Sequence, residues 1–488
     1  MDEITCLNPF CTIEEYEVDK KEYERFVINE LREDSLLKIL EKSKKLQIRL
    51  CKVPIQDRLE VLEKIGRLWA EKLDHGEYNQ LKMLLSKSTG YSTQLIELEF
   101  SFVTFVLNKE NIRKNLEYSF SKQIEGLHRF IEVEGQESYR FIPAGPVVVI
   151  SSGNSLIPPL IPTVLSMATG NFTILKPSIS NYLGIVEVCK LFKEASNESE
   201  TARLMTNALA ISYFTHDSNS LKYILGKAPI GVINFWGGEP ARTYVSKLVS
   251  ENPNHPRLLI NGPLTGVAII DEESANENVA ENLALNMVLY DQQLCSSPTR
   301  AIFIGCWKDA IKFAEEIGTA LNRIGSEYPS STSEGSIYTL QSVRRILRLS
   351  GSTVYASNET ENMWTLIVSK GKSVLENVIK SFPEFNIYNR KRFIEMIVIE
   401  DHNQIYQLIE ELPMNEAYIG VDKVQTVGLA LSEDKVEDVL EILTSSGVYR
   451  IVPLRDMSIR SAIEPYDGVN LASFFTNTIY LRKKPIEW

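Results

Sequence analysis

The polar segment LYDQQLCSSPTR, residues 289–300, contains a single cysteine, Cys295, between two glutamines and two serines. A thiolate is a strong nucleophile, and backbone N–H groups in a loop can stabilise it. Most cysteines are instead buried and inert. The residues around Cys295 leave both interpretations open, a nucleophile or a structural thiol. Cys51, Cys189 and Cys306 lie in segments with helical or strand-like patterns, and we expect all three in the core.

A second polar segment follows the apolar run VVVI and consists of Ser151, Ser152, Gly153 and Asn154. A helical pattern begins directly after it. The short amide side chain of Asn154 could donate a hydrogen bond to an oxyanion that develops during acyl transfer. The same residue types also cap helices, so a purely structural role as an N-cap is the alternative.

Two further segments combine polar or small residues with the ends of strand-like runs. In ILKPS, Lys176 and Ser178 follow an apolar run, where a lysine could bind ribose hydroxyls or a phosphate or could simply be solvated. In NFWGGEPA, Gly237 and Gly238 allow a close approach of backbone to a ligand, and the helix start after them suits a pyrophosphate. Trp236 could cover a nicotinamide or pack in the core.

The elements that position these segments alternate between strands and helices from residue 145 to residue 262. Their strands are apolar on both faces, which predicts a parallel sheet covered on both sides. Parallel sheets of this kind bind ligands at the carboxyl ends of their strands, where the three segments before Cys295 lie. A second α/β run begins near Thr265 and carries Cys295 in a loop between a helix and a strand. We therefore expect an α/β protein.

Other regions have a different character. The first 125 residues read mostly as helix, because apolar residues recur at spacings of three and four. The segment HRFIEVEGQESYRFIPAGP reads as an exposed hairpin, and the tail NLASFFTNTIYLRKKPIEW as a final strand that could pair with it.

Composition excludes several classes of function. The formal net charge of -12 argues against nucleic-acid and anionic-membrane binding, which need clustered Lys and Arg. No CxxC pair occurs, and Cys6 and Cys11 lack nearby histidines, so we expect no metal site. The most apolar region is interrupted by Gly, Asn and Pro, which argues against a membrane span. The acidic N-terminus does not resemble a secretory signal, and we expect a cytoplasmic protein.

Taken together, these segments resemble the aldehyde dehydrogenase superfamily, and more closely the long-chain acyl-CoA reductases of bacterial bioluminescence operons. The resemblance covers about residues 35–485 and rests on SSGNSLIPPLIPTVL, NFTILKPS, NFWGGEPA, INGPLTGVAIID and, above all, LYDQQLCSSPT. It implies an aldehyde dehydrogenase-like fold with two α/β domains and a β-arm. The implied cofactor-binding domain comprises residues 1–125 and 143–262, the catalytic domain 263–460, and the oligomerisation arm 126–142 and 470–488.

The resemblance also implies a mechanism. Cys295 would attack the thioester of a fatty acyl-CoA, Asn154 and the Cys295 N–H would hold the oxyanion, and NADPH would reduce the acyl-enzyme to the aldehyde. The residues matching the cofactor site are Ser152, Lys176, Ser178, Trp236, Gly237 and Gly238.

Three departures from the wider superfamily qualify this expectation. The ELGGK segment, whose glutamate activates water in ordinary aldehyde dehydrogenases, is replaced by INGPLTG, with Asn261 and Gly262 near that place and no carboxylate. Without a base, hydrolysis of the acyl-enzyme should be slow, which favours a reductase. Ile179 replaces an acid common in NAD-preferring relatives, so NADPH is admissible. Lys391 replaces a glutamate that contacts the nicotinamide ribose.

Two alternatives are retained: an aldehyde dehydrogenase that oxidises an aldehyde to an acid or acyl-CoA, and an acyl-carrying subunit without redox activity. The expected partners are acyl-CoA, NADPH, an acyl-protein synthetase subunit and further copies of the same chain.

Overall fold

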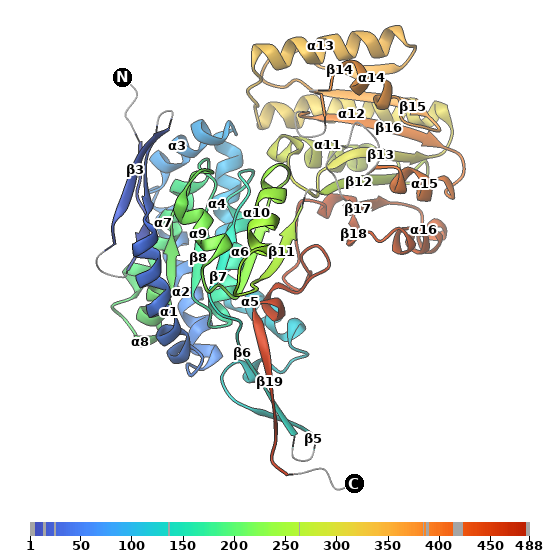
Figure 1. Ribbon diagram of the computed structural model, residues 1–488. Helices are drawn as coiled ribbons and strands as arrows, with labels where there is room; N and C mark the ends of the chain where they lie inside the picture. The colour runs from blue at the N-terminus through green and yellow to red at the C-terminus, as the bar shows by residue number, and fades with distance from the viewer. Residues whose placement is uncertain are drawn as a thin grey trace. The chain divides into compact units, whose positions relative to one another are not determined.

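The computed structural model describes residues 5–12, 16–23, 26–134, 137–262, 264–383, 385–386, 390–412 and 423–484. The chain forms two compact units (Figure 1). Unit 1 comprises Met1–Thr89, Glu97–Asn261 and Ser461–Trp488, and unit 2 comprises Gly90–Ile96 and Gly262–Arg460. Among the described residues, no helix is both long and apolar enough to cross a bilayer. The predicted α/β architecture is confirmed.

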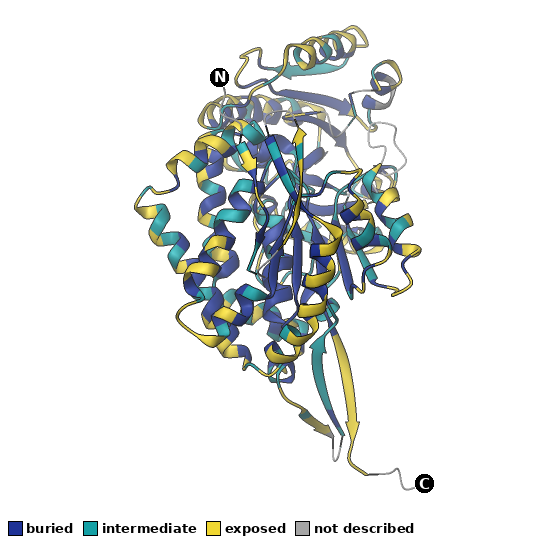
Figure 2. Cartoon of the chain, turned by 60° about the vertical axis from the view of Figure 1, so that its left-hand side comes forward, coloured by how far each residue is buried: buried dark blue, intermediate teal, exposed yellow. Residues whose placement is uncertain are grey.

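Unit 1 is built around a six-stranded sheet with the order β11-β10-β7-β8-β9-β2. Its strands are β11 (Arg257–Asn261), β10 (Val232–Trp236), β7 (Val147–Ile150), β8 (Thr173–Lys176), β9 (Leu209–Ile211) and β2 (Phe10–Cys11). All neighbours are parallel except β2, which pairs antiparallel with β9. Every residue of β7 and β8 is buried, because the apolar sequences of these strands are covered on both faces (Figure 2).

The helices that accompany this sheet fall into two groups along the sequence. Between β2 and β7 in the sequence lie α1 (Glu33–Leu50), α2 (Ile55–Asp74), α3 (Asn79–Thr89), α4 (Thr93–Leu107) and α5 (Lys109–Ser119), and the residues of α4 up to Ile96 belong to unit 2. Between its strands lie α6 (Ile157–Ala168), α7 (Tyr182–Ala195), α8 (Glu200–Asn207), α9 (Asn219–Gly226) and α10 (Ala241–Ser250). Trp69 of α2 is fully buried and stacks on Tyr78, with ring centroids 4.3 Å apart.

The expectation that the first 125 residues are mostly helix is confirmed from Glu33 onward, whereas the described residues before Glu33 form strands. A three-stranded sheet of order β1-β4-β3 forms from Thr5–Leu7, Phe26–Leu31 and Val18–Tyr23. The reason is that β4 alternates between more and less buried residues, a period-2 pattern that suits a strand lying on a core. The backbone N–H of Leu31 donates to Ser212 Oγ at 3.1 Å, which attaches β4 to the end of β9.

Unit 2 contains a seven-stranded sheet of order β14-β15-β16-β13-β12-β17-β18, in which only the β14–β15 pair is antiparallel. The strands are β12 (Leu264–Asp271), β13 (Pro298–Ile304), β14 (Thr353–Ala356), β15 (Thr365–Lys370), β16 (Phe393–Ile399), β17 (Lys423–Ala430) and β18 (Arg450–Pro453). The helices are α11 (Glu277–Val288), α12 (Trp307–Glu327), α13 (Glu334–Leu349), α14 (Leu375–Ser381), α15 (Gln404–Glu410) and α16 (Glu433–Ser445). Alternate residues of β12 belong to two separate apolar clusters, so both faces of the sheet are buried.

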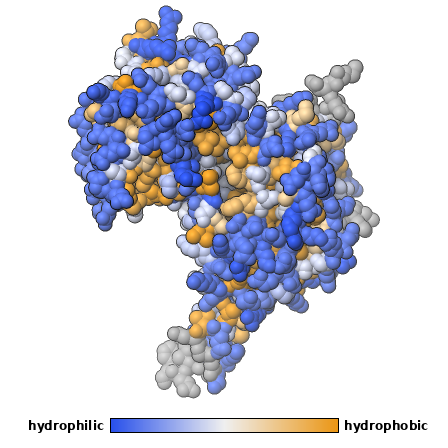
Figure 3. Space-filling model, turned by 180° about the vertical axis from the view of Figure 1, so that it is seen from behind, coloured by the Kyte–Doolittle hydropathy of each residue, from blue (hydrophilic) through white to orange (hydrophobic). Residues whose placement is uncertain are grey.

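A third sheet in unit 1 joins the predicted hairpin to the tail. Its order is β19-β6-β5, with β19 (Thr476–Arg482), β6 (Glu137–Pro143) and β5 (Ile131–Glu134) all antiparallel. The predicted turn residues 135–136 and the last residues of the tail, 485–488, lie outside the described part of the chain. Hydrophobic side chains remain exposed on this sheet and beside it (Figure 3): Phe130, Val133, Ile479, Tyr480 and Leu481.

Candidate active site

The carboxyl ends of three neighbouring strands of unit 1 meet at one edge of its sheet. Ile150 of β7 pairs with Lys176 of β8 on one side and with Phe235 of β10 on the other. The segments that follow these strands therefore leave the sheet side by side. The structure brings the predicted residues of unit 1 together at this edge, whereas Cys295 belongs to unit 2.

The predicted oxyanion residue lies in the loop after β7. The hydroxyl of Ser152 donates to Oδ1 of Asn154 at 2.8 Å, so the amide oxygen is the acceptor in this pair. An amide whose oxygen already accepts a hydrogen bond has a defined orientation, with its N–H groups on the other side of the carboxamide. Asn154 does not cap α6, because the N-cap position is Leu156 and no side chain caps it there. The capping alternative is therefore not what the structure shows.

A buried carboxylate that the sequence pattern did not reveal supports this loop. Glu99 of α4 is 2% exposed. Its Oε1 accepts hydrogen bonds from the N–H of Leu156, at 2.8 Å, and from the hydroxyl of Ser155. These bonds satisfy donors at the start of α6 and place a negative charge at the positive end of a helix. Glu99 therefore fixes the point at which the Asn154 loop turns into α6.

Ser178 lies directly against this loop. Its hydroxyl is 3.0 Å from that of Ser180, which in turn donates to the carbonyl of Gly153 at 3.0 Å. A Cβ atom at Gly153 would lie 2.7 Å from Ser178 Oγ. Glycine at position 153 therefore allows the loops after β7 and β8 to touch.

Lys176 is the most unusual charged residue at this edge. It is 8% exposed, and its Nζ lies 4.7 Å from the centre of the Tyr213 ring. Burial lowers the pKa of its ammonium to about 8, although the Glu30 carboxylate favours the charged form. No hydrogen bond or ion pair of Nζ is found within the described residues. A buried ammonium that lies over a ring face is suited to a hydroxyl-rich or anionic ligand.

The loop after β10 contains the two glycines predicted to bind a pyrophosphate, but a carboxylate of the same loop already occupies part of this place. Gly237 donates its N–H to the carbonyl of Asn261 at 3.2 Å, and the carbonyl of Gly238 accepts from Arg242 in the first turn of α10. However, the Glu239 carboxylate accepts from the N–H of Thr243 at 3.2 Å. This hydrogen bond lowers the pKa of Glu239. The helix start predicted for a pyrophosphate thus already carries a side-chain anion.

Trp236 is held by a buried chain of amides. Its indole N–H donates to Asn234 Oδ1 at 2.6 Å, and Asn234 donates to Asn261 Oδ1 at 2.7 Å. Asn261 then donates to the carboxylate of Asp467 at 3.0 Å. The ring of Trp236 is only half-buried and meets Tyr466 edge-on, with centroids 5.0 Å apart.

The carboxylate of Asp467 corrects one expectation. The segment INGPLTG has no acid, and the sequence therefore predicted no carboxylate near Asn261; Pro263 of this segment lies outside the described residues. The structure places Asp467 there from a distant part of the chain. Local sequence could not show this contact, because the two residues are 206 positions apart.

In unit 2, Cys295 lies in the loop that enters β13, the central strand of the sheet, and it is half-buried. The two glutamines before it anchor this loop. Gln292 donates to the carbonyls of Pro298 and Phe393, at 2.6 and 3.0 Å, and accepts from the Phe393 N–H at 2.6 Å. Gln293 donates to the carbonyl of Arg390 at 2.7 Å. The polar residues of the motif thus hold a partly accessible thiol in a defined loop.

The other cysteines give two different outcomes. Cys189 is 1% exposed, and burial raises the pKa of its thiol, so the core expectation is confirmed. Cys306 is exposed and Cys51 half-buried, so the core expectation is wrong for both. Cys306 sits at the N-cap of α12, outside the apolar face of that helix. It clusters with Glu272 and Asp309, both also exposed.

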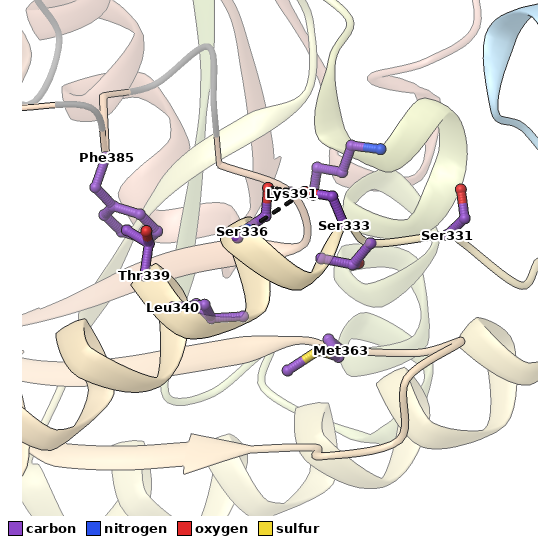
Figure 4. Close-up of a pocket in the computed structure, with 10 residues that line it drawn as sticks. Ser331, Ser333, Ser336, Thr339, Leu340, Met363, Phe385 and Lys391 are labelled. Carbon is purple, nitrogen blue, oxygen red and sulfur yellow. Dashed lines mark hydrogen bonds between the residues drawn. The ribbon is translucent and has the colours of Figure 1, made fainter.

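A cavity of about 670 Å³ lies in unit 2 (Figure 4), a volume typical of small-molecule sites. Figure 4 shows Lys391 and Ser331 on one side of it and Phe385 on the other. The remaining wall carries the hydroxyls of Thr332, Ser333, Ser336 and Thr339 and the apolar side chains of Leu340 and Met363. Lys391 also pairs with Asp291, with Nζ 3.3 Å from Oδ2. Such a lining suits a ligand with polar and apolar parts.

A family model and the curated relatives point to the same family of proteins. The family model described as acyl-CoA reductase (LuxC) matches residues 50–477. The long-chain acyl-protein thioester reductase 2 of Photobacterium leiognathi is 22% identical over 275 residues, which are 56% of this chain and 55% of that protein. The matched parts span only 50% to 63% of the curated relatives.

Two solved structures show the same fold. A salicylaldehyde dehydrogenase from Pseudomonas putida G7 superposes with a TM-score of 0.71 at 13% identity, covering 99% of both chains. The glyceraldehyde-3-phosphate dehydrogenase GapN from Methanocaldococcus jannaschii, solved with NADP, gives a TM-score of 0.66 at 14% identity and covers 96% of this chain and 100% of its own. The aldehyde dehydrogenase-like fold expected from the sequence is therefore confirmed.

Proposed function

Because this chain belongs to the acyl-CoA reductase (LuxC) family, we propose that it reduces a fatty acyl thioester, acyl-CoA in the first instance, to the aldehyde with NADPH. The observation that carries this proposal is the family match across both units, which includes the anchored loop of Cys295. The curated relatives are named for acyl-protein thioesters, so an acylated protein is the alternative acyl donor.

In the proposed first step, the Cys295 sulfur attacks the thioester carbonyl carbon, and the bond from that carbon to the departing thiolate breaks. The acyl group moves from one sulfur to another, so a thioester is conserved and no oxidant is needed. We assign the oxyanion to the Asn154 amide and the Cys295 N–H. Ser152 supports this role, because its hydrogen bond to Asn154 Oδ1 directs the amide donors elsewhere.

We assign cofactor binding to Ser152, Lys176, Ser178, Trp236, Gly237 and Gly238. When bound, NADPH supplies a hydride to the acyl carbon. The buried ammonium of Lys176 fits a ribose or phosphate group, because it lacks an ion-pair partner among the described residues. A pyrophosphate could bind the backbone amides at the start of α10 only if the Glu239 carboxylate first broke its hydrogen bond with Thr243 and moved away. The cofactor therefore fits at Lys176 better than at α10.

Intact-protein mass measurement tests the proposal. Wild-type protein mixed with hexadecanoyl-CoA should gain one acyl group, and NADPH should discharge it as aldehyde. Cys295→Ala should gain none, while Cys189→Ala, which removes a buried thiol, should behave as wild type. Normal aldehyde production by Cys295→Ala would refute the covalent mechanism.

A hydrolytic aldehyde dehydrogenase is the second candidate, and Asp467 is the observation that favours it. Its carboxylate lies beside Asn261, where ordinary members of the superfamily carry their base. If Asp467 activates water, the acyl-enzyme should decay to the free acid without NADPH, and Asp467→Asn should slow that decay about 10²-fold or more. An acyl-enzyme that is stable for many turnover times in both proteins would exclude this candidate.

Further features of the proposal concern partners and location. The exposed apolar residues of the β5-β6-β19 sheet support a homo-oligomer formed through this arm. An acyl-protein synthetase partner and a cytoplasmic location are proposed with it. An acyl carrier without redox activity, the remaining alternative, would accept the acyl group on Cys295 but would not oxidise NADPH.

A further inference from the structure

Residues 290–292, directly before the Cys295 loop, have an unusual backbone. Tyr290, Asp291 and Gln292 all have positive φ angles, of 55°, 49° and 64°. Residues with a Cβ atom rarely adopt this left-handed conformation, and three in succession are rarer still. Such strain persists only where surrounding contacts impose it, and it concentrates at functional sites.

The contacts that impose it centre on Asp291. Its carboxylate is almost fully buried, with 3% of the side chain exposed. Oδ1 accepts from Arg392 Nε at 3.0 Å, and Oδ2 accepts from the Ser330 hydroxyl at 2.7 Å and from Lys391 Nζ at 3.3 Å. Arg392 is equally buried, so this is an ion pair removed from water. Removing one partner of such a pair leaves the other charge uncompensated.

The flanking residues lock the same turn from both sides. The ring of Tyr290 packs edge-on against Tyr91, with centroids 5.7 Å apart. Gln292 is fixed to the backbone of Pro298 and Phe393, as described above. Lys391, Arg392 and Phe393 each form a polar bond with the turn. Arg390 accepts a hydrogen bond from Gln293, directly after the turn. Cys295 follows this turn by only a few residues, so the turn sets the direction in which its loop leaves.

We infer that Asp291 is a positioning residue: with Arg392 it holds the left-handed turn at 290–292 and thereby fixes Cys295 in the orientation for attack on the thioester. This inference rests on the proposed function of Cys295. Asp291 does not touch the reacting atoms in this scheme. It acts through the backbone. Of the two cations that bind its carboxylate, Arg392 is the buried one, whereas the side chain of Lys391 is 41% exposed.

A matched control is available in the same sheet. Asp271 is also a fully buried aspartate with a lysine partner, Lys435, at 3.1 Å. It ends β12 beside Ile304, whereas Cys295 precedes Pro298 at the opposite end of β13. Asp271→Asn therefore removes a buried charge at comparable cost to the fold, but far from the thiol.

The experiment measures three properties of wild type, Asp291→Asn, Arg392→Lys and Asp271→Asn. They are the thermal midpoint of unfolding, the first-order rate and half-saturating concentration of acylation by hexadecanoyl-CoA, and the rate at which iodoacetamide alkylates Cys295, read from its peptide by mass spectrometry. Asp291→Asn should lower the acylation rate by about 10- to 100-fold, with the half-saturating concentration within about twofold. Its alkylation rate should rise, because a released loop exposes the half-buried sulfur.

Arg392→Lys should also lower the acylation rate. A further variant that combines Asp291→Asn with Arg392→Lys should lose less than the product of the two single losses. Asp271→Asn should lower the thermal midpoint as much as Asp291→Asn but retain acylation within about threefold. Unchanged acylation in Asp291→Asn, an equal loss in Asp271→Asn, or a parallel fall of acylation and alkylation would each overturn the inference. Absence of any acyl adduct on wild type would instead refute the proposed function, and the alkylation rates would still test the positioning role.

Discussion

Replacing Lys176 by methionine should stabilise the protein without cofactor and weaken dinucleotide binding. Methionine has similar length and no charge, so it can fill the buried space beside Tyr213. The native lysine, by contrast, keeps an ammonium in a poorly solvated position. A residue that costs stability in the free protein is expected where it serves a ligand.

The magnitude follows from the pKa of Lys176, which burial lowers from 10.5 to about 8. A difference of about 2.5 between the two pKa values corresponds to about 3.5 kcal/mol, at about 1.4 kcal/mol for each pKa unit. Below about pH 8 both the folded and the unfolded chain hold the proton, and the folded state bears the full cost. Between about pH 8 and 10.5 the unfolded state binds more protons, so the free energy of unfolding rises with pH. Above 10.5 the cost has disappeared.

Lys176→Met should therefore exceed wild type in unfolding free energy by about 3.5 kcal/mol at pH 7, and the difference should shrink toward zero near pH 10.5. Hydrogen exchange of amides in β8, measured from pH 7 to 10, reports this local stability within unit 1. Lys435→Met is the opposite control. Partial burial opposes the charge of Lys435, but its bonds with Asp271 and Glu273 prevail and raise its pKa, so removing it should destabilise the protein.

Cofactor binding supplies a second readout of the same substitution. An anion at Lys176 would raise its pKa, so NADPH binding should take up a proton and weaken as pH rises above about 8. Binding by Lys176→Met should be weak and independent of pH over this range. The reasoning fails if Lys176→Met is no more stable than wild type at pH 7, or if the difference does not change between pH 7 and 10.

Three further outcomes are expected. Asn154→Ala should slow acylation of the thiol about 10²- to 10³-fold in a single-turnover mass assay, because one oxyanion donor is lost. Gly266→Ala should slow it as well, since a Cβ there would lie 2.7 Å from the Ser297 carbonyl oxygen, a backbone atom that must shift. Gly428→Ala would meet the buried side chains of Met457 and Leu454, not backbone, and should slow acylation less. Trp69→Ala should lower the unfolding free energy by about 3 to 5 kcal/mol in urea titration, because the ring is fully buried and its N–H is bonded to Phe100.

Much of unit 1 could be predicted from the sequence because its strands are short, apolar and separated by helices. Runs such as VVVI and TILK are buried along their whole length, and that pattern has few alternatives. The polar residues after these strands were found for the same reason, since they stand where each apolar run stops. The N-terminal strands were missed because β3 is rich in charged residues and lies largely exposed, which gave no apolar signal.

The missed site residues share one physical cause, which is contact between distant parts of the chain. Glu99 lies within a helical segment, and its carboxylate accepts a hydrogen bond from the N–H of Leu156, 57 residues away. Asp467 contacts Asn261, although nearly all of unit 2 lies between these two residues in the sequence. The positive φ angles at 290–292 also have no local signal, because the sequence there lacks glycine. Sequence patterns reveal elements and their ends, whereas these contacts depend on the assembled tertiary structure.

The short strand β2 has a practical consequence. Phe10 and Cys11 pair with the outer side of β9, so that β2 instead of β9 is the edge strand of the sheet. A shortened protein starting at α1 would leave the β9 amide and carbonyl groups on this outer side unpaired, and unpaired borders recruit other chains. Such a truncation should express mainly as aggregate, even though every residue assigned to chemistry would still be present.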